Sequence, residues 1–347
     1  MPCSTALLIG RRIGRRIGQP AALLALALAL PPDRPAETQS RRQARATRAA
    51  SVASRQARTD ALAPPEDPAA GIGLAPGMAP PPGAPRPPEF SADLLLPFLW
   101  NTDAEQAIRG RPSPELTPEA RLTWTRRLEA QPIRLSALLD ASSDRFMRAQ
   151  DADADLLYGR LRAQYESGQD DQEWQPFASY VPTYSFAPTY ARRVDTWHDV
   201  ALGASRSWNW DAALRRLPPG PDTDSAAAWS VNVNGALQRR QRDGGPPSFA
   251  ALLNPSVTWT LSAAWSTSLE LDVTRRWFDR FEGRRRADWL LTPILTVEFQ
   301  PPEGWLPAIG APVLDLQVFL TRQASSAPEG RFHQWGAGPI LRTAWKF

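Results

Sequence analysis

The last nine residues of the chain, Pro339 to Phe347, alternate between two kinds of side chain. The larger and mostly apolar residues take every second position, counted back from the end: Phe347, Trp345, Thr343, Leu341 and Pro339. Lys346, Ala344 and Arg342 take positions between them, and Ile340 is the one apolar exception. Because successive side chains of a strand point to opposite faces, this segment predicts a strand with one apolar and one polar face. A last strand of this kind is typical of transmembrane β-barrels.

In these residues the chain resembles the outer-membrane barrel proteins of Gram-negative bacteria, whose last strand carries a terminal aromatic residue. The resemblance covers roughly residues 91–347, and its specific part is the terminal strand. It implies a closed antiparallel β-barrel embedded in outer-membrane lipid. It also implies that Leu341, Trp345 and Phe347 form an assembly signal, read by the barrel-assembly machinery.

The N-terminus has the features of a secretory signal. Arginines precede an apolar run from Ala21 to Leu30, and Ala27 and Ala29 form a cleavage pattern of small residues. The run is far shorter than the roughly 20 residues of a spanning helix. We therefore expect a signal peptide over residues 1–29, which leads the chain out of the cytoplasm.

Residues 30–90 are rich in proline, alanine and arginine, which predicts a disordered periplasmic leader. Its arginines make it a candidate contact for an acidic periplasmic partner. The net charge of +4 is too small and too dispersed to indicate nucleic-acid binding. The single cysteine, Cys3, lies within the expected signal, so we expect no disulfide and no thiolate metal site in the mature chain. Two isolated histidines do not indicate a metal site, and no motif indicates a cofactor.

Turn and strand signals repeat from about Ser91 to the end of the chain. Residues alternate clearly in several segments; for example, Val257, Trp259 and Leu261 alternate with hydroxyl side chains. We predict an all-β fold, a closed barrel of twelve antiparallel strands near 92–101, 119–129, 132–142, 154–166, 176–190, 198–210, 227–241, 253–265, 267–279, 288–300, 312–323 and 334–347.

For a chain that starts in the periplasm, an even number of strands returns the C-terminus to the periplasm, as bacterial barrels require. On this topology the periplasmic turns at Glu129–Pro132 and Ser266–Thr267 are tight, whereas the outer loops are longer. The alternative is a barrel of eight strands from near Phe177, preceded by a helical segment at 91–175 in which Glu119–Glu129 and Asp151–Glu166 form helices.

Tryptophans gather near the ends of the predicted strands, which favours two aromatic girdles at the membrane interfaces. The residues expected in these girdles are Trp208, Trp210, Trp229, Trp265, Trp277, Trp289, Trp335 and Trp345.

The same strand register places charged side chains inside the barrel. Arg134, Arg160 and Arg162 lie on one wall, opposite Glu270, Asp272, Glu298 and Asp315, with Arg276 and Arg342 near the acidic side. Such facing charges would orient polar solutes in a wet channel. The alternative is a salt-bridge network that fills the lumen.

Evidence for an enzyme is weak. The stretch Arg206-Ser207-Trp208-Asn209 resembles one in outer-membrane phospholipase A, which implies that Asn209 would orient His198. That family's serine nucleophile lies two residues after its histidine, where this chain has Val200. We therefore expect no enzymatic activity and no catalytic residue. The sequence favours a passive channel for small hydrophilic solutes, with a non-conducting structural or adhesive barrel as the alternative and a lipid-modifying enzyme as a third, weaker one.

Overall fold

Antiparallel β-strands make up most of the part of the chain that the structure describes. This structure is a computed structural model, and it describes residues 89–104, 106, 110–128, 131–166, 173–217, 227–243, 245–281, 284–301 and 312–347. The expected signal peptide and almost all of the expected leader lie outside the described residues. The first strand begins at Glu89, within the last residues of that leader.

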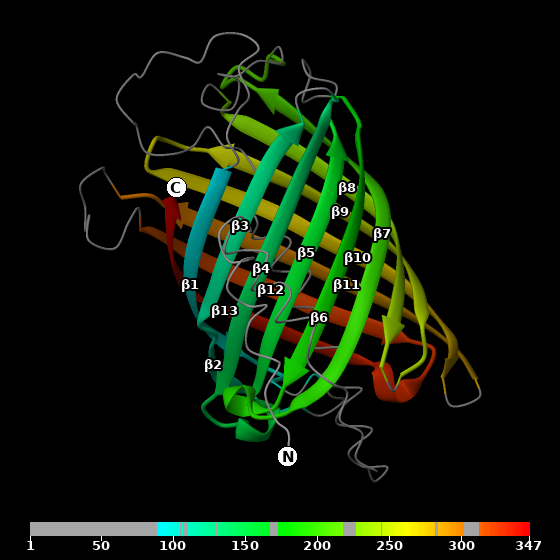
Figure 1. The fold of residues 1–347 in the computed structure, drawn as a ribbon. Coiled ribbons are helices and arrows are strands. Elements are labelled where there is room, and N and C mark those ends of the chain that lie inside the picture. Colours follow the sequence, from blue (N-terminus) through cyan, green and yellow to red (C-terminus); the bar gives the residue numbers. More distant parts are fainter. Residues whose placement is uncertain are drawn as a thin grey trace, which may run out of the picture. The chain divides into compact units, whose positions relative to one another are not determined.

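The strands follow one another along the chain with few interruptions (Figure 1). They are β1(Glu89–Asn101), β2(Ser113–Leu116), β3(Glu119–Leu128), β4(Ile133–Phe146), β5(Ala154–Tyr165), β6(Gln175–Phe186), β7(Arg193–Trp210), β8(Trp229–Arg242), β9(Ser248–Thr260), β10(Trp265–Phe281), β11(Arg284–Phe299), β12(Val313–Ser325) and β13(Phe332–Lys346).

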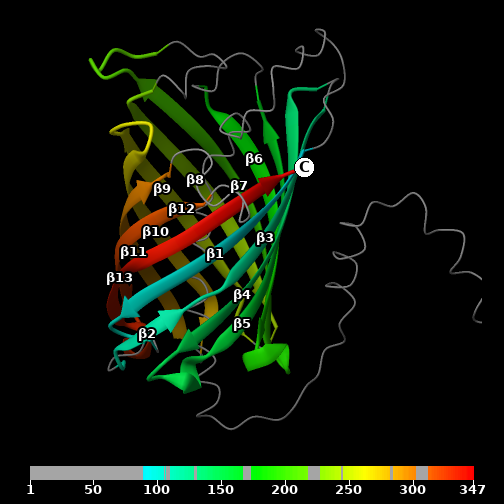
Figure 2. The ribbon, with the colours of Figure 1, turned by 90° about the vertical axis from the view of Figure 1, so that its left-hand side faces the viewer.

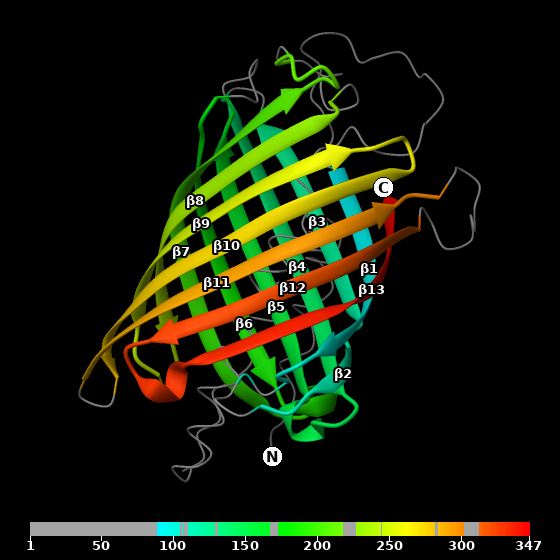
Figure 3. The same ribbon diagram turned by 180° about the vertical axis from the view of Figure 1, so that it is seen from behind.

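The strands form a closed barrel with twelve strand positions, as the sequence predicts. β2 and β3 both pair with β1 and with β4, so together they occupy one position. They are separated at Pro118, which has no N–H group to donate to the ladder. β13 pairs with β1 from Ser91↔Lys346 to Asn101↔Gly336 and closes the barrel (Figure 3).

The eight-strand alternative is wrong. The segments proposed there as helices form β3 and β5, because alternation of side chains between lipid and lumen outweighs the helix propensity of their alanines and leucines. The helices among the described residues are short 3₁₀ turns, namely η1(Gln150–Ala152), η2(Pro188–Tyr190) and η4(Pro328–Gly330). Within the described residues, no helix has the length and apolar character needed to cross a membrane.

Two details of the predicted connections are corrected. The turn between β9 and β10 lies at residues 261–264, where the Leu261 N–H donates to the Trp265 carbonyl at 2.9 Å, so Ser266 and Thr267 belong to β10. The outer loops are not the longer set, because residues expected at 280–287 and 242–252 mostly continue the strands. β13 ends at what we call the C-terminal end of the barrel, and the 3₁₀ turns lie at the opposite, distal end (Figure 2).

The two faces of the sheet differ in chemistry. Large apolar side chains on the outer face are strongly exposed, as with Leu202 at 65% and Leu316 at 55%, although burial would normally stabilise them. Inward-facing positions on the same strands are mostly polar and often buried; β12 alternates between the exposed outer and buried inner positions over most of its length. This arrangement suits lipid outside the barrel and a polar interior.

The barrel lumen as the candidate functional site

Small polar side chains form a continuous lattice on the lumen face of β7 to β10. Cross-strand register aligns them in rows across the four strands. We call them the polar lattice: Ser205, Asn234, Asn254 and Asp272 in one row, Ser207, Asn232, Ser256 and Glu270 in the next, and Asn209, Ser230, Thr258 and Ser268 in the row nearest the C-terminal end.

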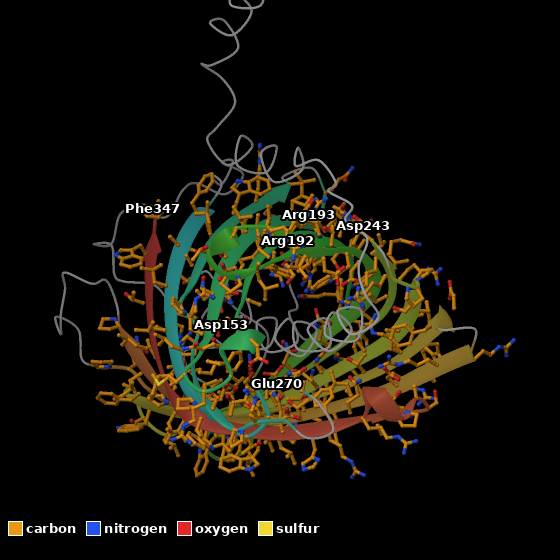
Figure 4. The ribbon with its side chains drawn as sticks, turned by 90° about the horizontal axis from the view of Figure 1, so that it is seen from below. Asp153, Arg192, Arg193, Asp243, Glu270 and Phe347 are labelled. Atoms are coloured by element: carbon orange, nitrogen blue, oxygen red, sulfur yellow. The ribbon has the colours of Figure 1, made fainter. Side chains whose placement is uncertain are left out.

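Members of the polar lattice hydrogen-bond across the strands. The Asn232 side-chain amide donates to Ser207 Oγ at 2.8 Å, and the Asn254 amide donates to the Asp272 carboxylate. Most of the lattice is partly exposed, in contrast to the strongly buried lumen positions elsewhere in the barrel. Figure 4 shows Glu270 on the inner side of the ring of strands. These hydroxyl, amide and carboxylate groups can exchange hydrogen bonds with water or with a hydrated solute.

Nearer the distal end, arginine–aspartate pairs line the same side of the lumen. Arg240 donates from Nε and Nη2 to the two oxygens of Asp199, each at 2.7 Å, and Asp199 is fully buried. We call this group the ion-pair belt: Asp199–Arg240, Asp195–Arg242 and Arg286–Asp288, together with Arg276, which donates to Ser248 and Gln238. Bidentate pairs hold both charges in fixed geometry, so the belt fixes this part of the lumen wall.

The structure brings most of the predicted lumen charges into local contacts. Arg342 pairs with Glu298 at 2.5 Å and lies 3.5 Å from Asp315, so these three form one cluster at the C-terminal end. Arg134 pairs with Glu166 at 2.8 Å. Arg342 was expected near the acidic side of the lumen, and the structure places it in contact with Glu298 and Asp315. Long arginine side chains reach across adjacent strands, which strand periodicity does not specify.

Arg160 and Arg162 lie on the lumen face of β5, and Glu270 and Asp272 lie on that of β10. These strands occupy well-separated positions in the barrel order. The Cζ atom of Arg162 lies 3.8 Å from the ring centroid of Phe177, so its guanidinium is held against the wall by a cation–π contact.

Apolar side chains also pack inside the barrel. One cluster joins Leu99, Ile294, Phe319 and Ile340, all nearly fully buried, from four adjacent strands. The Phe319 ring lies over Gly336, since a Cβ placed there would lie 2.4 Å from it. The sequence offered one signal of this cluster, the apolar Ile340 on the otherwise polar face of the last strand. The sequence interpretation missed both this cluster and the polar lattice as a unit.

The predicted interface aromatics lie at two levels of the barrel. Trp277, Trp289 and Trp335 lie on the outer face near the distal end. Near the C-terminal end, Trp229 stacks on Trp259 with ring centroids 4.9 Å apart. Trp208, Trp210, Trp265 and Trp345 lie at this level too. Of the three residues predicted to form an assembly signal, Leu341 and Phe347 have exposed side chains.

The two histidines do not form the arrangement implied by the phospholipase resemblance. His198 lies on the outer face of β7, where Tyr180 Oη lies 2.8 Å from its Nδ1 atom. Asn209 alternates to the opposite face of the same strand and lies in the lumen, so Asn209 does not orient His198. Among the described residues, no group of three histidine, cysteine or acidic side chains is placed to hold a metal ion.

Comparison with known proteins gives structural likenesses only. No protein-family model and no curated protein matches the sequence. An outer membrane channel from Pseudomonas putida F1 is 13% identical with a TM-score of 0.43, over 78% of this chain and 100% of that chain. The translocator domain of autotransporter NalP from Neisseria meningitidis is 10% identical with a TM-score of 0.43, over 87% and 97%. The NanC porin is 8% identical with a TM-score of 0.40, over 73% and 98%. Nothing about the function of this chain follows from these values.

The closed antiparallel barrel and the large apolar side chains exposed on its outer face define its environment. Spanning barrels with an even number of antiparallel strands belong to the bacterial outer membrane. The chain is an integral β-barrel of the Gram-negative outer membrane.

Proposed function

We propose that the barrel is a passive channel for small hydrophilic solutes, and that the polar lattice is the wall along which they move. The observation that supports this function is the unbroken run of hydroxyl, amide and carboxylate groups across β7 to β10. A solute that sheds part of its hydration shell regains hydrogen bonds from such a wall at little cost in free energy. Short side chains also leave more of the lumen to the solute than long ones do.

Charged side chains on the lumen face would set the ion preference of this channel. Glu270 and Asp272 belong to the polar lattice, and Arg160 and Arg162 lie on another wall of the lumen. Rings or walls of fixed charge favour ions of the opposite sign in a narrow wet channel. The two sets therefore act in opposite directions on the ratio of cation to anion permeability.

The test is single-channel recording of the full-length protein, refolded in detergent and inserted into a planar bilayer. We expect discrete ohmic steps. Glu270→Gln with Asp272→Asn should lower the cation-to-anion permeability ratio, and Arg160→Gln with Arg162→Gln should raise it. Asp279→Asn is the matched control, because it removes a carboxylate from the outer face of the same strand. A ratio that moves in neither double variant would reject these residues as the selectivity determinants.

A non-conducting structural barrel is the second candidate. It is favoured by the buried ion-pair belt and by the apolar cluster around Phe319, both of which occupy lumen positions. Packed side chains of this kind fill small barrels. A folded, heat-modifiable protein that gives no conductance would reject the channel and favour this candidate.

A lipid-modifying enzyme is the least supported candidate, and we propose that the chain has no such activity. His198 contacts Tyr180 on the outer face, and Val200 occupies the position that would carry a nucleophile. In a lipid hydrolysis assay, His198→Ala and His333→Ala should leave the release of fatty acid at the level of the unaltered protein. A lower release of fatty acid by either folded variant than by the unaltered protein would reject this proposal.

A further inference from the structure

Two arginines lie on the lipid-facing surface near the distal aromatic girdle. Arg275 alternates with Val273 and Trp277 on the outer face of β10, and Arg322 follows Leu320 on the outer face of β12. Trp277 and Leu320 are exposed side chains of the outer band, at 40% and 47%. Both arginines therefore point away from the lumen, toward the membrane.

The register across β11 places these arginines close to each other. On β11, the cross-strand neighbour of Arg275 is Trp289. The cross-strand neighbour of Arg322 is Leu291, the next outward residue of the same strand. Strand spacing and rise per residue put their Cα atoms about 12 Å apart. Two extended guanidinium groups at that separation can contact a single polar headgroup lying between them. On the opposite side of β12, His333 of β13 is the cross-strand neighbour of Arg322.

Tryptophan rings hold Arg275 at the level of the girdle. Its Cζ atom lies 4.9 Å from the ring centroid of Trp289 and 5.6 Å from that of Trp277. Indole rings prefer the boundary between headgroups and hydrocarbon, so the guanidinium lies at headgroup level. An arginine costs about 2–4 kcal/mol on the lipid face at the membrane midplane and about 0–1 kcal/mol near the interface. Its position therefore avoids most of that cost.

Neither arginine has an ion-pair partner among the described residues. Asp279 lies on the same face of β10, but Arg239 binds both of its carboxylate oxygens, at 3.0 and 2.5 Å. Two cations at the membrane boundary thus lack a counter-charge from the described part of the barrel. The most available anions at headgroup level are lipid phosphates, which guanidinium groups bind through two parallel hydrogen bonds.

We propose that Arg275 and Arg322 form a binding site for the phosphate groups of lipopolysaccharide. An even number of strands places both ends of the barrel chain on the same side of the membrane. With that side in the periplasm, as in bacterial outer-membrane barrels, the distal end faces the outer leaflet. Lipopolysaccharide is the phosphorylated glycolipid of that leaflet, so its charge and position complement the site. This binding does not depend on whether the lumen conducts.

The test measures lipid bound to the full-length protein in detergent by native mass spectrometry. The probe is bisphosphorylated lipid A, compared with lipid A from which both phosphates have been removed. We expect Arg275→Gln and Arg322→Gln each to weaken binding of the phosphorylated probe about tenfold, and the double variant to bind it no better than the dephosphorylated one. Heat-modifiability on gels shows that each variant is folded.

Arg206→Gln is the matched control. Arg206 also stacks on outer-face tryptophans, Trp208 at 5.0 Å and Trp174 at 5.9 Å, but near the C-terminal end. This variant should keep full binding of phosphorylated lipid A. Equal loss in this variant, or unchanged binding in the folded double variant, would overturn the site. Phosphatidylglycerol that binds as tightly as phosphorylated lipid A, and depends on Arg275, would overturn the choice of lipopolysaccharide. An absence of conductance with lipid A binding intact would reject the proposed channel and leave this site unaffected.

Discussion

The guanidinium of Arg162 lies 3.8 Å from the ring centroid of Phe177, and the same ring packs over Gly203 on the next strand. Phe177 and Gly203 are cross-strand partners on the lumen face. The missing side chain at Gly203 leaves room for the tip of the Phe177 ring, and the ring offers its face to the arginine. Three adjacent strands therefore fix the position of one lumen charge.

Gly203→Ala should destabilise the barrel. A Cβ atom at this position would lie 2.5 Å from the Phe177 ring and 2.3 Å from the carbonyl oxygen of Gly235. Overpacking of this kind should lower the free energy of unfolding by about 1–3 kcal/mol, measured by urea unfolding in detergent micelles. Gly235→Ala is the matched control on the neighbouring strand, where the nearest atoms lie 3.7 and 3.9 Å away. Equal effects of the two substitutions would contradict the close packing of Phe177 against Gly203.

Removing one partner of the buried pair Asp199–Arg240 should be more harmful than removing both. Asp199→Asn or Arg240→Gln alone leaves an uncompensated charge in a buried site and should lower the free energy of unfolding by about 3 kcal/mol. The double variant should lose less than either single variant, because neither charge is then left buried without its partner. Additive losses would show that the pair is not coupled. The exposed pair Arg215–Asp211 at the rim serves as control and should show little change.

Phe347→Ala should impair assembly without weakening the finished barrel. The Phe347 side chain is 78% exposed, and the backbone N–H of this residue donates to the Phe90 carbonyl at 2.9 Å. The change should therefore alter the free energy of unfolding, measured in urea, by less than about 0.5 kcal/mol. If the terminal aromatic residue is an assembly signal, the amount of folded protein in the outer membrane should fall severalfold in cells. Leu320→Ala, an exposed outer-face change away from the terminal strand, should leave that amount unchanged.

Tyr190 should make the distal η2 turn sensitive to alkaline pH. Its hydroxyl donates to the carbonyls of Ser142 and Leu156 at 3.1 and 3.2 Å. Burial, and then the charge of Asp155, raise the pKa of this phenol above its ordinary value. The stability that its hydrogen bonds contribute is fully present below a pH of about 10 and is lost as the pH rises through the folded-state pKa.

Tyr190→Phe isolates this contribution from that of the other tyrosines. At pH 8 the variant should be less stable than the unaltered protein by about 1 kcal/mol in urea unfolding, because a hydrogen bond is lost. The difference in the free energy of unfolding between the two proteins should become smaller as the pH rises above about 10. A difference that stays constant to pH 11 would exclude titration of Tyr190 as its cause.

The sequence by itself determined the fold class, the strand count and most strand positions. Period-two alternation, such as that from Leu314 to Leu320, indicates which side chains lie on the apolar outer face of a strand. Because this pattern is local, it can be recognised in one strand without its neighbours. An even number of such strands ending on Phe347 then indicates a closed membrane barrel.

Only the tertiary structure decided which lumen side chains meet. The rows of the polar lattice depend on the register between strands, and a single sequence does not fix that register at each pair. The pairing of Glu298 and Asp315 with Arg342, and the packing of Phe319 over Gly336, depend on long side chains that reach across strands. Alternation gives the face on which a residue lies, whereas its partners are set by inter-strand register and by the curvature that closes the barrel.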